Sequence, residues 1–326
     1  MGFYKDKRIL VTGGTGMIGK SLVEKLIKEG GNVRVVSIDD PSRSNPESEF
    51  IKADLTRYEN CEKACHGMDY VFHVAGIKVN TRRAKENPAS VFVPTILFNT
   101  NMMEAAKQCK VERYLYTSSV GVYSPAEVFY EDEVWKSFPS ENDKFAGWAK
   151  RMGELQAEAY KIEYGWDKIS IVRPSNIYGP YDTFHPEKAM GVAALIRAAV
   201  DGQNPLVAYG DGTQIRDFLY VDDAAEAMML VLEKGYNKPI NIGSGVGHPM
   251  KDIINIILDN VNPRPEVFFD TSKPSGDKRR VLDTERIKSL GWFPEVSLEE
   301  GIKRTIEWYN RNKDKDISQN QYNVLS

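Results

Sequence analysis

The sequence predicts an α/β protein in which a doubly wound parallel sheet is followed by a smaller C-terminal lobe. Three observations indicate this class. A glycine-rich turn at residues 13–19 separates a short apolar run from a stretch with helical spacing. Strand and helix patterns then alternate up to about residue 174, as they do in βαβ units. Beyond residue 174 the chain is richer in turns and polar loops, which indicates a second unit.

The composition is that of an ordinary globular protein. The chain has 326 residues, of which 41% are hydrophobic and 27% charged, enough to bury a sizeable core. Its net charge of −3 gives no reason to expect nucleic acid or an anionic membrane as a partner. The first residues lack the long apolar segment of a signal peptide, and no later stretch predicts a membrane span. We therefore expect a cytoplasmic protein.

The three cysteines predict neither disulfide bonds nor a metal site. Cys61, Cys65 and Cys109 are too few and too irregularly spaced for a disulfide framework. Cys61 and Cys65 are four residues apart on a predicted helix, so we expect them to share one buried or half-buried face. A metal ion would need further ligands, and the nearest histidine, His66, lies elsewhere on that helix.

The glycine-rich turn has the spacing of a dinucleotide-binding turn. Gly13 permits a tight turn, Gly16 lets the backbone approach a phosphate, and Gly19 lets the helix pack close to the strand. The helix N-terminus, with Met17 and Ile18, offers unpaired N–H groups and a positive dipole end to an anion. Glycines alone also mark ordinary turns, but the flanking strand and helix favour the dinucleotide site.

The strand predicted at residues 33–38 ends where a dinucleotide fold selects its cofactor. A carboxylate at this place binds both ribose hydroxyls of NAD, whereas serine and arginine accommodate the 2′-phosphate of NADP. Ser37 stands where the acid is expected, and Asp39 follows two residues later. The cofactor is therefore NAD or NADP, and Asp39 favours NAD.

Two further strand ends are expected to line the cofactor. Asp54 and Leu55 end the third predicted strand, where Asp54 suits an adenine amino group. An equally good interpretation makes Asp54 the cap of the next helix. The apolar run 70–76 predicts a strand buried on both faces, and Ala75 near its end is small enough for a cofactor to approach. We interpret His73 in this run as a hydrogen-bonded core histidine rather than a catalyst.

The later patterns complete the first domain and set its boundaries. Residues 99–106 predict a helix that buries the pair Met102–Met103, and the strand predicted at 113–119 ends in hydroxyl side chains. We expect four segments: a dinucleotide-binding domain at 1–174, a stretch at about 213–245 that returns to it, a substrate-binding lobe mainly at 175–310, and a polar tail at 311–326 that frays.

Four stretches indicate a family. They are Ser118–Tyr123, Gly147–Glu154, Tyr178–Pro180 with Phe184–Pro186, and Asp270–Pro274. With them the chain resembles, from Gly13 to Trp308, the extended short-chain dehydrogenases/reductases that act on nucleotide sugars. It looks most like GDP-L-fucose synthases and their GDP-mannose-modifying relatives. The resemblance implies hydride exchange between a sugar carbon and NAD or NADP, a GDP-linked sugar as substrate, and a homodimer formed by the helices around 99–108 and 150–160.

The resemblance also implies an active site, with one departure. In the family a tyrosine is the acid/base, a lysine four residues later lowers the pKa of the tyrosine and holds the ribose, and a serine or threonine orients the sugar oxygen. Lys150 matches the lysine and Ser119 the hydroxyl, but Ala146 occupies the tyrosine position. Arg173 matches a further cofactor-binding position.

Alanine has no proton to give, and general acid–base catalysis typically contributes about 10²–10⁴-fold to a rate. Three interpretations remain open: a chain disabled to trap substrate, a natural variant that uses another group, or a protein that keeps the fold to bind or sense. For the second interpretation, Tyr123 and His185 are the candidate proton donors.

Other differences narrow the reaction. GDP-L-fucose synthases resemble GDP-mannose 3,5-epimerases in a cysteine base two residues after the serine, and Gly121 stands there. Sugar 4,6-dehydratases carry an Asp-Glu pair where this chain has Val120 and Gly121. These differences leave two kinds of reaction: oxidation or reduction at one carbon, or 4-epimerisation. The alternatives are an NADPH-dependent 4-keto-6-deoxy-sugar reductase and a catalytically silent nucleotide-sugar-binding protein.

The substrate diphosphate has its own matching positions. Asn176, Arg216 and Arg279 match family residues in contact with the diphosphate, and guanidinium groups suit phosphate oxygens. Each arginine could instead form a surface ion pair of little consequence. Lys78 and Arg82–Arg83 could approach the cofactor or the sugar, or belong to a solvated loop.

Overall fold

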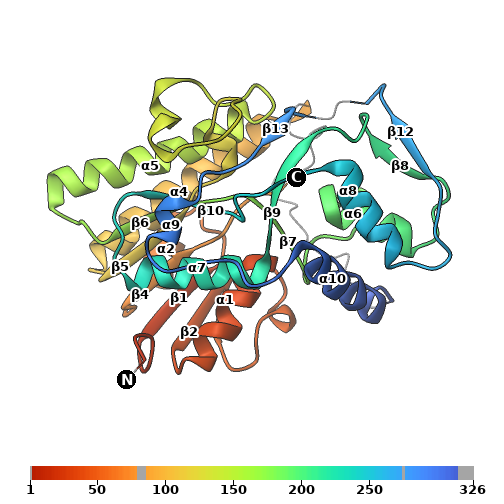
Figure 1. Ribbon diagram of the computed structural model, residues 1–326. Helices are drawn as coiled ribbons and strands as arrows, with labels where there is room; N and C mark the ends of the chain where they lie inside the picture. Colours follow the sequence, from red (N-terminus) through yellow and green to blue (C-terminus); the bar gives the residue numbers. More distant parts are fainter. Residues whose placement is uncertain (1, 79–85, 274–275, 315–326) are drawn as a thin grey trace.

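The core of the computed structural model is a seven-stranded, entirely parallel sheet with strand order β3-β2-β1-β4-β5-β6-β10 (Figure 1). The structure describes residues 2–78, 86–273 and 276–314. The seven strands are β1 (Arg8–Thr12), β2 (Asn32–Ser37), β3 (Glu49–Lys52), β4 (Tyr70–His73), β5 (Arg113–Thr117), β6 (Ile169–Pro174) and β10 (Pro239–Ile242). The predicted doubly wound parallel sheet is confirmed.

Helices cover both faces of this sheet (Figure 1). They are α1 (Met17–Lys28) and α7 (Val221–Glu233) on one face, and α2 (Tyr58–Cys65), α4 (Ala89–Gln108) and α5 (Lys144–Tyr164) on the other. Val11 of β1 packs in the first cluster and its neighbour Leu10 in the second, because successive strand residues point to opposite faces. Both faces are therefore buried, which explains the near-continuous apolar strands.

Two sequence expectations concern the core under α2 and α4. Cys61 and Cys65 are fully buried on the sheet side of α2, and Met102 and Met103 of α4 belong to the same cluster. Both expectations are confirmed.

A second unit is built around a small sheet in which β9 is central. Its strands are β7 (Asn176–Tyr178), β9 (Ile215–Tyr220), β11 (Gly247–Pro249) and β13 (Arg279–Arg280), and β8 (Leu206–Tyr209) pairs separately with β12 (Val267–Asp270). The helices α6 (Gly191–Val200), α8 (Met250–Asp259) and α10 (Leu298–Asn312) pack around a third cluster. The described residues also form the short helices α9 (Glu285–Lys288), η1 (Pro41–Arg43), η2 (Val120–Val122) and η3 (Glu131–Lys136).

The chain crosses between the two units more than once. Within the stretch 213–245, β9 lies in the small sheet, whereas α7 packs against the main sheet and β10 joins it. The predicted polar tail lies outside the described residues from position 315 onward. Among the described residues, no helix combines the length and apolar character needed to cross a membrane.

His73 is a core histidine, as predicted. The Thr12 hydroxyl lies 2.8 Å from its Nδ1, and its Nε2 lies 2.9 Å from Asn99 Oδ1. Since Asn99 presents its carbonyl oxygen, Nε2 carries the proton and Nδ1 accepts from Thr12. Burial, reinforced by the Lys150 charge, lowers the pKa of His73 from 6.5 to about 3, against the opposing effect of Asn99. The ring therefore stays neutral at physiological pH.

This shift predicts a loss of stability in acid. Between pH 6.5 and about 3 the unfolded chain binds a proton at position 73 that the folded protein refuses, so the free energy of unfolding falls as the pH falls. We expect His73→Gln to lose less stability than the wild type between pH 7.5 and pH 5 in urea titrations. His66→Gln, the same change at an exposed histidine outside the core, is the control variant. Equal pH dependence in His73→Gln would contradict the assignment.

Candidate active site

The glycine-rich turn has the shape that a dinucleotide phosphate needs. Gly13 has a φ of +67°, and a side chain there would begin 2.9 Å from Ala75 Cα. A side chain on Gly19 would overlap the Gly13 carbonyl and come 2.6 Å from Gly14 Cα. Gly16 begins α1 without a side-chain hydrogen bond, and no acid stands in the first helical turn. This open, uncapped N-terminus fits an anion.

The end of β2 meets this turn through three hydroxyl or carboxyl groups. The Thr15 hydroxyl donates to Asp39 Oδ2 at 2.6 Å and lies 2.8 Å from the Ser37 hydroxyl. The backbone N–H of Asp39 donates to Ser37 Oγ at 3.2 Å. Arg43 Nη1 lies 3.8 Å from the same Asp39 carboxylate. Both residues that were expected to select the cofactor therefore lie beside the glycine-rich turn.

Asp54 lies before the turn that leads into α2 and not at the N-cap of that helix, which is Arg57 and has no side-chain cap hydrogen bond, so Asp54 does not form the cap weighed as its alternative role. Its Oδ1 accepts from the backbone N–H and the hydroxyl of Thr56, at 2.9 and 2.8 Å, in the turn that leads into α2. Leu55 is buried in the core under α2. Ala75, in contrast, borders the turn, because its N–H donates to Thr12 Oγ1 at 3.0 Å and its Cα abuts Gly13.

Lys150, Ser119 and Ala146 meet where β5 ends and α5 begins. Lys150 Nζ donates to the carbonyl of Thr117, the last residue of β5, at 2.8 Å. Burial lowers the pKa of Lys150 from 10.5 to about 8, against the opposing charge of Glu154. Ser119 Oγ accepts from the Gly121 N–H at 3.0 Å. Ala146 is exposed, one helical turn before Lys150 on the same face of α5.

Asp143 occupies the space beside Gly121. A side chain on Gly121 would begin 3.3 Å from Asp143 Cβ and 3.4 Å from Ser119 Oγ. The Asp143 carboxylate forms an ion pair with Arg280, whose guanidinium also donates to Asp277. Asp143 thus places a charged group beside the predicted site, and no sequence motif pointed to it.

Two predicted site residues have other roles. Arg173 was expected to bind the cofactor, yet it is fully buried and forms a bidentate ion pair with Glu154, at 2.9 and 2.7 Å. Its Nη1 donates to Tyr123 Oη at 3.0 Å and to the Glu131 carbonyl at 2.8 Å. Burial and these protein partners argue against a direct contact between Arg173 and a cofactor.

Tyr123 was expected as a proton donor and is only 3% exposed. Its hydroxyl donates to Asn241 Oδ1 at 2.6 Å and accepts from Arg173. Burial raises the pKa of Tyr123 above its usual range, although Arg173 opposes this. These contacts remove Tyr123 from the candidates for proton exchange with a sugar.

One local signal could have revealed this network. Arg173 stands in an apolar strand run buried on both faces, and a charge in such a place needs a partner. The partners Glu154, Glu131 and Asn241 come from α5, η3 and β10, so the pattern shows the need for a partner without naming it.

The predicted substrate residues gather on the small sheet. Asn176 lies on β7, Arg216 on β9 and Arg279 on β13, and β9 pairs with both other strands. Asn176 Nδ2 donates to the Asp217 carbonyl at 2.8 Å, and Arg279 Nε donates to the Glu127 carbonyl at 2.7 Å. Burial, with the nearby Arg280 charge, lowers the pKa of Arg216 to about 10. The half-buried Arg216 thus lies near Arg280 and near the carboxylates of Asp277 and Asp143, which oppose this shift of its pKa.

His185 comes from the lobe segment that follows β7. It is half-buried, and its Nδ1 accepts from the Glu187 N–H at 3.2 Å. When Nδ1 accepts, the proton of the neutral ring resides on Nε2. His185 can therefore present a proton donor. Lys78 forms an ion pair with Asp182 of the same segment, whereas Arg82 and Arg83 lie outside the described residues.

The comparison with known families agrees with this geometry. The family described as "NAD dependent epimerase/dehydratase family" matches residues 9–243, from β1 to the end of β10. The chain belongs to this family. The resemblance inferred from the sequence motifs is thus confirmed at the level of the family.

Individual members show the range of the family. GDP-L-fucose synthase 1 of Arabidopsis thaliana is 31% identical over 317 residues, which cover 94% of each chain. A putative UDP-glucose 4-epimerase of Methanocaldococcus jannaschii is 32% identical over 310 residues, covering 93% of this chain and 99% of that protein. The solved complex of Thermus thermophilus UDP-glucose 4-epimerase with NAD has a TM-score of 0.81 at 27% identity, covering 93% and 99%.

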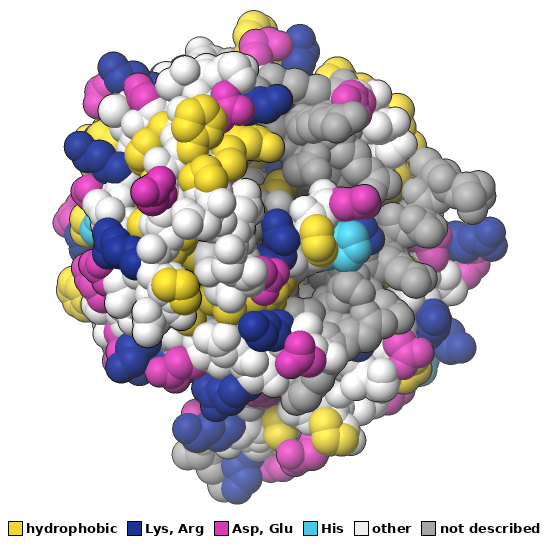
Figure 2. Space-filling view, turned by 90° about the vertical axis from the view of Figure 1, so that its right-hand side faces the viewer, with side chains coloured by type: hydrophobic (Ala, Val, Ile, Leu, Met, Phe, Trp, Pro, Cys, Tyr) yellow, Lys and Arg dark blue, Asp and Glu magenta, His cyan; other side chains and the backbone are white. Residues whose placement is uncertain are grey.

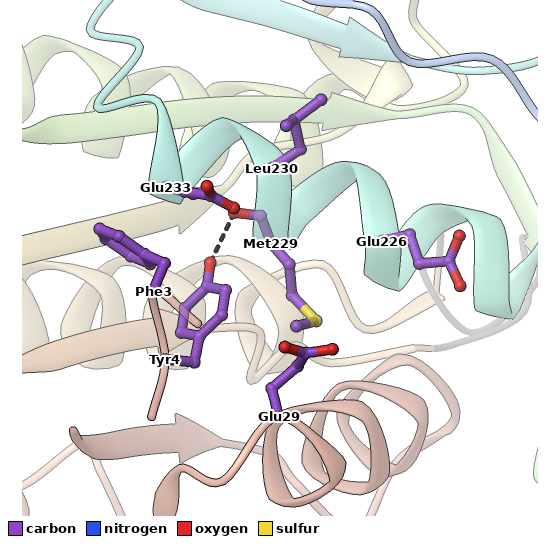
Figure 3. Close-up of a pocket in the computed structure, with 7 residues that line it drawn as sticks. All are labelled: Phe3, Tyr4, Glu29, Glu226, Met229, Leu230 and Glu233. Atoms are coloured by element: carbon purple, nitrogen blue, oxygen red, sulfur yellow. Dashed lines mark hydrogen bonds between the residues drawn. The ribbon is translucent and has the colours of Figure 1, made fainter. Parts of the chain in front are cut away.

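Other features of the surface lie apart from the candidate active site. A pocket of about 240 Å³ lies between the N-terminal residues and α7 (Figure 3). It is lined by Glu29 at the C-terminal end of α1, a helix length away from the glycine-rich turn. Among the described residues, no group of three or more His, Cys, Asp or Glu side chains could hold a metal. Acidic and basic side chains are interspersed on the face shown in Figure 2.

The assignment of Arg173 predicts a large effect on stability and none on the cofactor. Arg173→Met leaves the Glu154 charge buried without its partner, so we expect the free energy of unfolding to fall by about 3–5 kcal/mol. Arg304→Met, which breaks an exposed pair with Glu300, should cost less than about 1 kcal/mol. Urea titrations measure both.

At a temperature where Arg173→Met is folded, NADH titrations should give wild-type affinity. A weakened affinity in a fully folded Arg173→Met protein would restore Arg173 as a cofactor ligand.

Proposed function

We propose that this protein is an NAD-dependent nucleotide-sugar epimerase or oxidoreductase that acts at C4 of a GDP-linked hexose. The observation that carries the proposal is the position of Lys150, held on the Thr117 carbonyl beside Ser119 at the carboxyl end of β5. In open α/β sheets ligands bind at the carboxyl ends of the strands. The glycine-rich turn after β1 lies at the same edge, because β1, β4 and β5 are adjacent and parallel.

Asp39 supports NAD as the cofactor. Its carboxylate is turned toward Thr15 of the glycine-rich turn, where it can accept from ribose hydroxyl groups. A 2′-phosphate would meet this negative charge, although Arg43 at 3.8 Å partly compensates it.

Gly121 and Val120 support chemistry at a single carbon. Neither can act as a base, and Asp143 fills the space into which a side chain on Gly121 would extend. A second ionisable group for 3,5-epimerisation or for elimination of water is therefore missing at these positions. Removal of a hydride from C4 and its return on the other face needs no such group.

Each residue of the site has its own proposed role. A bound NAD would accept the hydride and return it. Ser119 is placed to hydrogen-bond the reacting sugar oxygen, and the Lys150 ammonium, mostly protonated at pH 7, stabilises negative charge next to it. Ala146 leaves the place of a proton-transfer group empty on the exposed face of α5. His185, with its proton on Nε2, is the remaining candidate to supply one.

The substrate class is proposed from the small sheet and from the relatives. Arg216, Arg279 and Asn176 lie on adjacent strands and can bind a diphosphate together. The similarity to a GDP-L-fucose synthase favours a GDP-sugar, and the similarity to UDP-glucose 4-epimerases makes UDP-sugars the comparison.

The decisive experiment restores the missing hydroxyl. We expect Ala146→Tyr to raise turnover on a GDP-, UDP- or dTDP-sugar by about 10²–10⁴-fold, because it supplies a general acid/base one helical turn from Lys150. Ala146→Phe is the matched control, with the ring but no hydroxyl, and should remain at the wild-type rate. Products are followed by mass spectrometry and NMR.

The other outcomes are equally informative. An active wild type that is harmed by tyrosine would locate proton transfer elsewhere, first at His185. Stoichiometric loss of added NADPH would identify a reductase, since an epimerase regenerates its cofactor. Binding of cofactor and nucleotide sugar by both proteins without turnover would favour the silent binding protein.

We also propose a homodimer formed through α4 and α5. The two helices pack together, and their outer faces carry apolar side chains in water: Val93, Leu97, Leu155 and Ile162, the last 77% exposed. An apolar surface of this kind is typical of a protein interface.

Leu155→Glu should therefore shift the protein from dimer to monomer in light-scattering chromatography, because it places a charge in the interface. Val246→Glu changes an equally exposed apolar residue of the lobe and should leave the dimer intact. A dimer that persists in Leu155→Glu would argue against this interface.

A further inference from the structure

Two adjacent residues of the lobe contact both sides of the dinucleotide site. Tyr181 and Asp182 follow β7. Lys20 Nζ lies 4.2 Å from the centre of the Tyr181 ring, and the Lys78 ammonium forms an ion pair with Asp182. Lys20 follows Gly19 in the first turns of α1, and Lys78 follows β4.

The positions of these two lysines define the opening of the site. β4 is the neighbour of β1 in the sheet, and its end abuts the glycine-rich turn, since Gly13 is in contact with Ala75. Lys20 and Lys78 therefore flank the carboxyl end of β1. Consecutive Cα atoms are only about 3.8 Å apart. A segment that meets one lysine with Tyr181 and the other with Asp182 therefore bridges α1 and the residues that follow β4, on either side of the glycine-rich turn.

The conformation of this segment is held by several contacts. Tyr181 has a φ of +65°, in the left-handed region that costs a side chain free energy. Its ring packs edge-on against Trp308 of α10, with 5.0 Å between ring centres. The Asp182 side chain is 7% exposed and accepts from the Thr183 N–H at 2.7 Å. A strained residue persists only where its surroundings determine it, and here Tyr181 is held between Lys20 of α1 and Trp308 of α10.

We propose that residues 181–182 form a strap across the dinucleotide site, and that its contacts with Lys20 and Lys78 keep the cofactor bound from one catalytic cycle to the next. The inference rests on the proposed cofactor site. A dinucleotide lying on the glycine-rich turn is covered by the strap, and the strap must separate from both lysines before the dinucleotide leaves.

The strap favours an epimerase over a reductase. An epimerase takes a hydride from the sugar and returns it, so it gains from a cofactor that stays in place. A reductase must release its oxidised cofactor in every cycle, and a slow strap would limit its rate. Retention therefore favours the reaction that regenerates its own cofactor.

The test measures cofactor release without any sugar. Protein is loaded with NADH, and in parallel with NADPH, and then mixed rapidly with excess oxidised cofactor, while nicotinamide fluorescence reports dissociation. Asp182→Asn removes the charge that holds Lys78. Tyr181→Gly removes the ring that contacts Lys20 and Trp308, and glycine adopts a φ of +65° without strain. We expect each variant to release the cofactor at least tenfold faster than the wild type.

Two controls separate the strap from general effects. Val246→Ala changes an exposed apolar side chain of the lobe and should release the cofactor at the wild-type rate. Glu300→Gln breaks an exposed ion pair on α10 and should also have no effect. Circular dichroism and thermal unfolding verify that every variant is folded.

The outcomes distinguish the strap from the site beneath it. Off-rates within twofold of the wild type in both strap variants would overturn the strap and leave the cofactor site standing. Tighter binding by Asp182→Asn with an unchanged off-rate would also overturn it, since Asp182 would then only compete with the cofactor for Lys78. A wild type that binds neither NADH nor NADPH would overturn the cofactor site and the strap with it.

Discussion

The buried ion pair between Arg173 and Glu154 fixes the helix on which the active site depends. Glu154 lies one turn after Lys150 on α5, and its carboxylate accepts from Arg173 of β6 and, at 2.5 Å, from the hydroxyl of Ser118. Ser118 in turn precedes Ser119. One carboxylate thus joins α5, the end of β5 and β6, and so determines where Lys150 lies relative to Ser119. The charges are costly to bury, and the bidentate geometry together with the further hydrogen bonds of Arg173 offsets that cost.

The cofactor side of the site follows from a different constraint, the close contact between Gly19 and Gly13. Because neither residue has a side chain, α1 can begin against the turn that ends β1, with its N-terminus left uncapped. Each half of the site, the glycine-rich turn and the region around Lys150 and Ser119, is held by its own local contacts. The sheet brings them together, since β4 alone separates β1 from β5. His73 of β4 is hydrogen-bonded to Thr12 of β1 and Asn99 of α4, which ties the strand between the two halves into the core.

The lobe carries the basic side chains that we propose to bind the diphosphate. Arg216 and Arg279 lie on paired strands of the small sheet, while Arg280 links β13 to Asp143 at the start of α5. The segment that carries Tyr181, Asp182 and His185 follows β7 of the same sheet. A substrate held on the small sheet would therefore lie against the start of α5. There lie Ala146 and Gly121, neither of which can ionise, together with Lys150, Ser119 and Asp143.

The sequence by itself determined those parts of the protein that depend on local stereochemistry. The spacing of Gly13, Gly16 and Gly19 predicted the turn, and a side chain on Gly13 or Gly19 would indeed clash with neighbouring backbone. The apolar runs predicted the parallel sheet, because its strands are buried on both faces. Lys150 and Ser119 were found through motifs, and the structure brings them together at the end of β5. The tertiary structure decided the roles of Arg173 and Tyr123, which the sequence had assigned to the cofactor and to proton transfer. Their partners, Glu154, Glu131 and Asn241, lie on separate elements. A buried polar group must be paired, but its partner is chosen by packing between distant segments, and no local pattern contains that information.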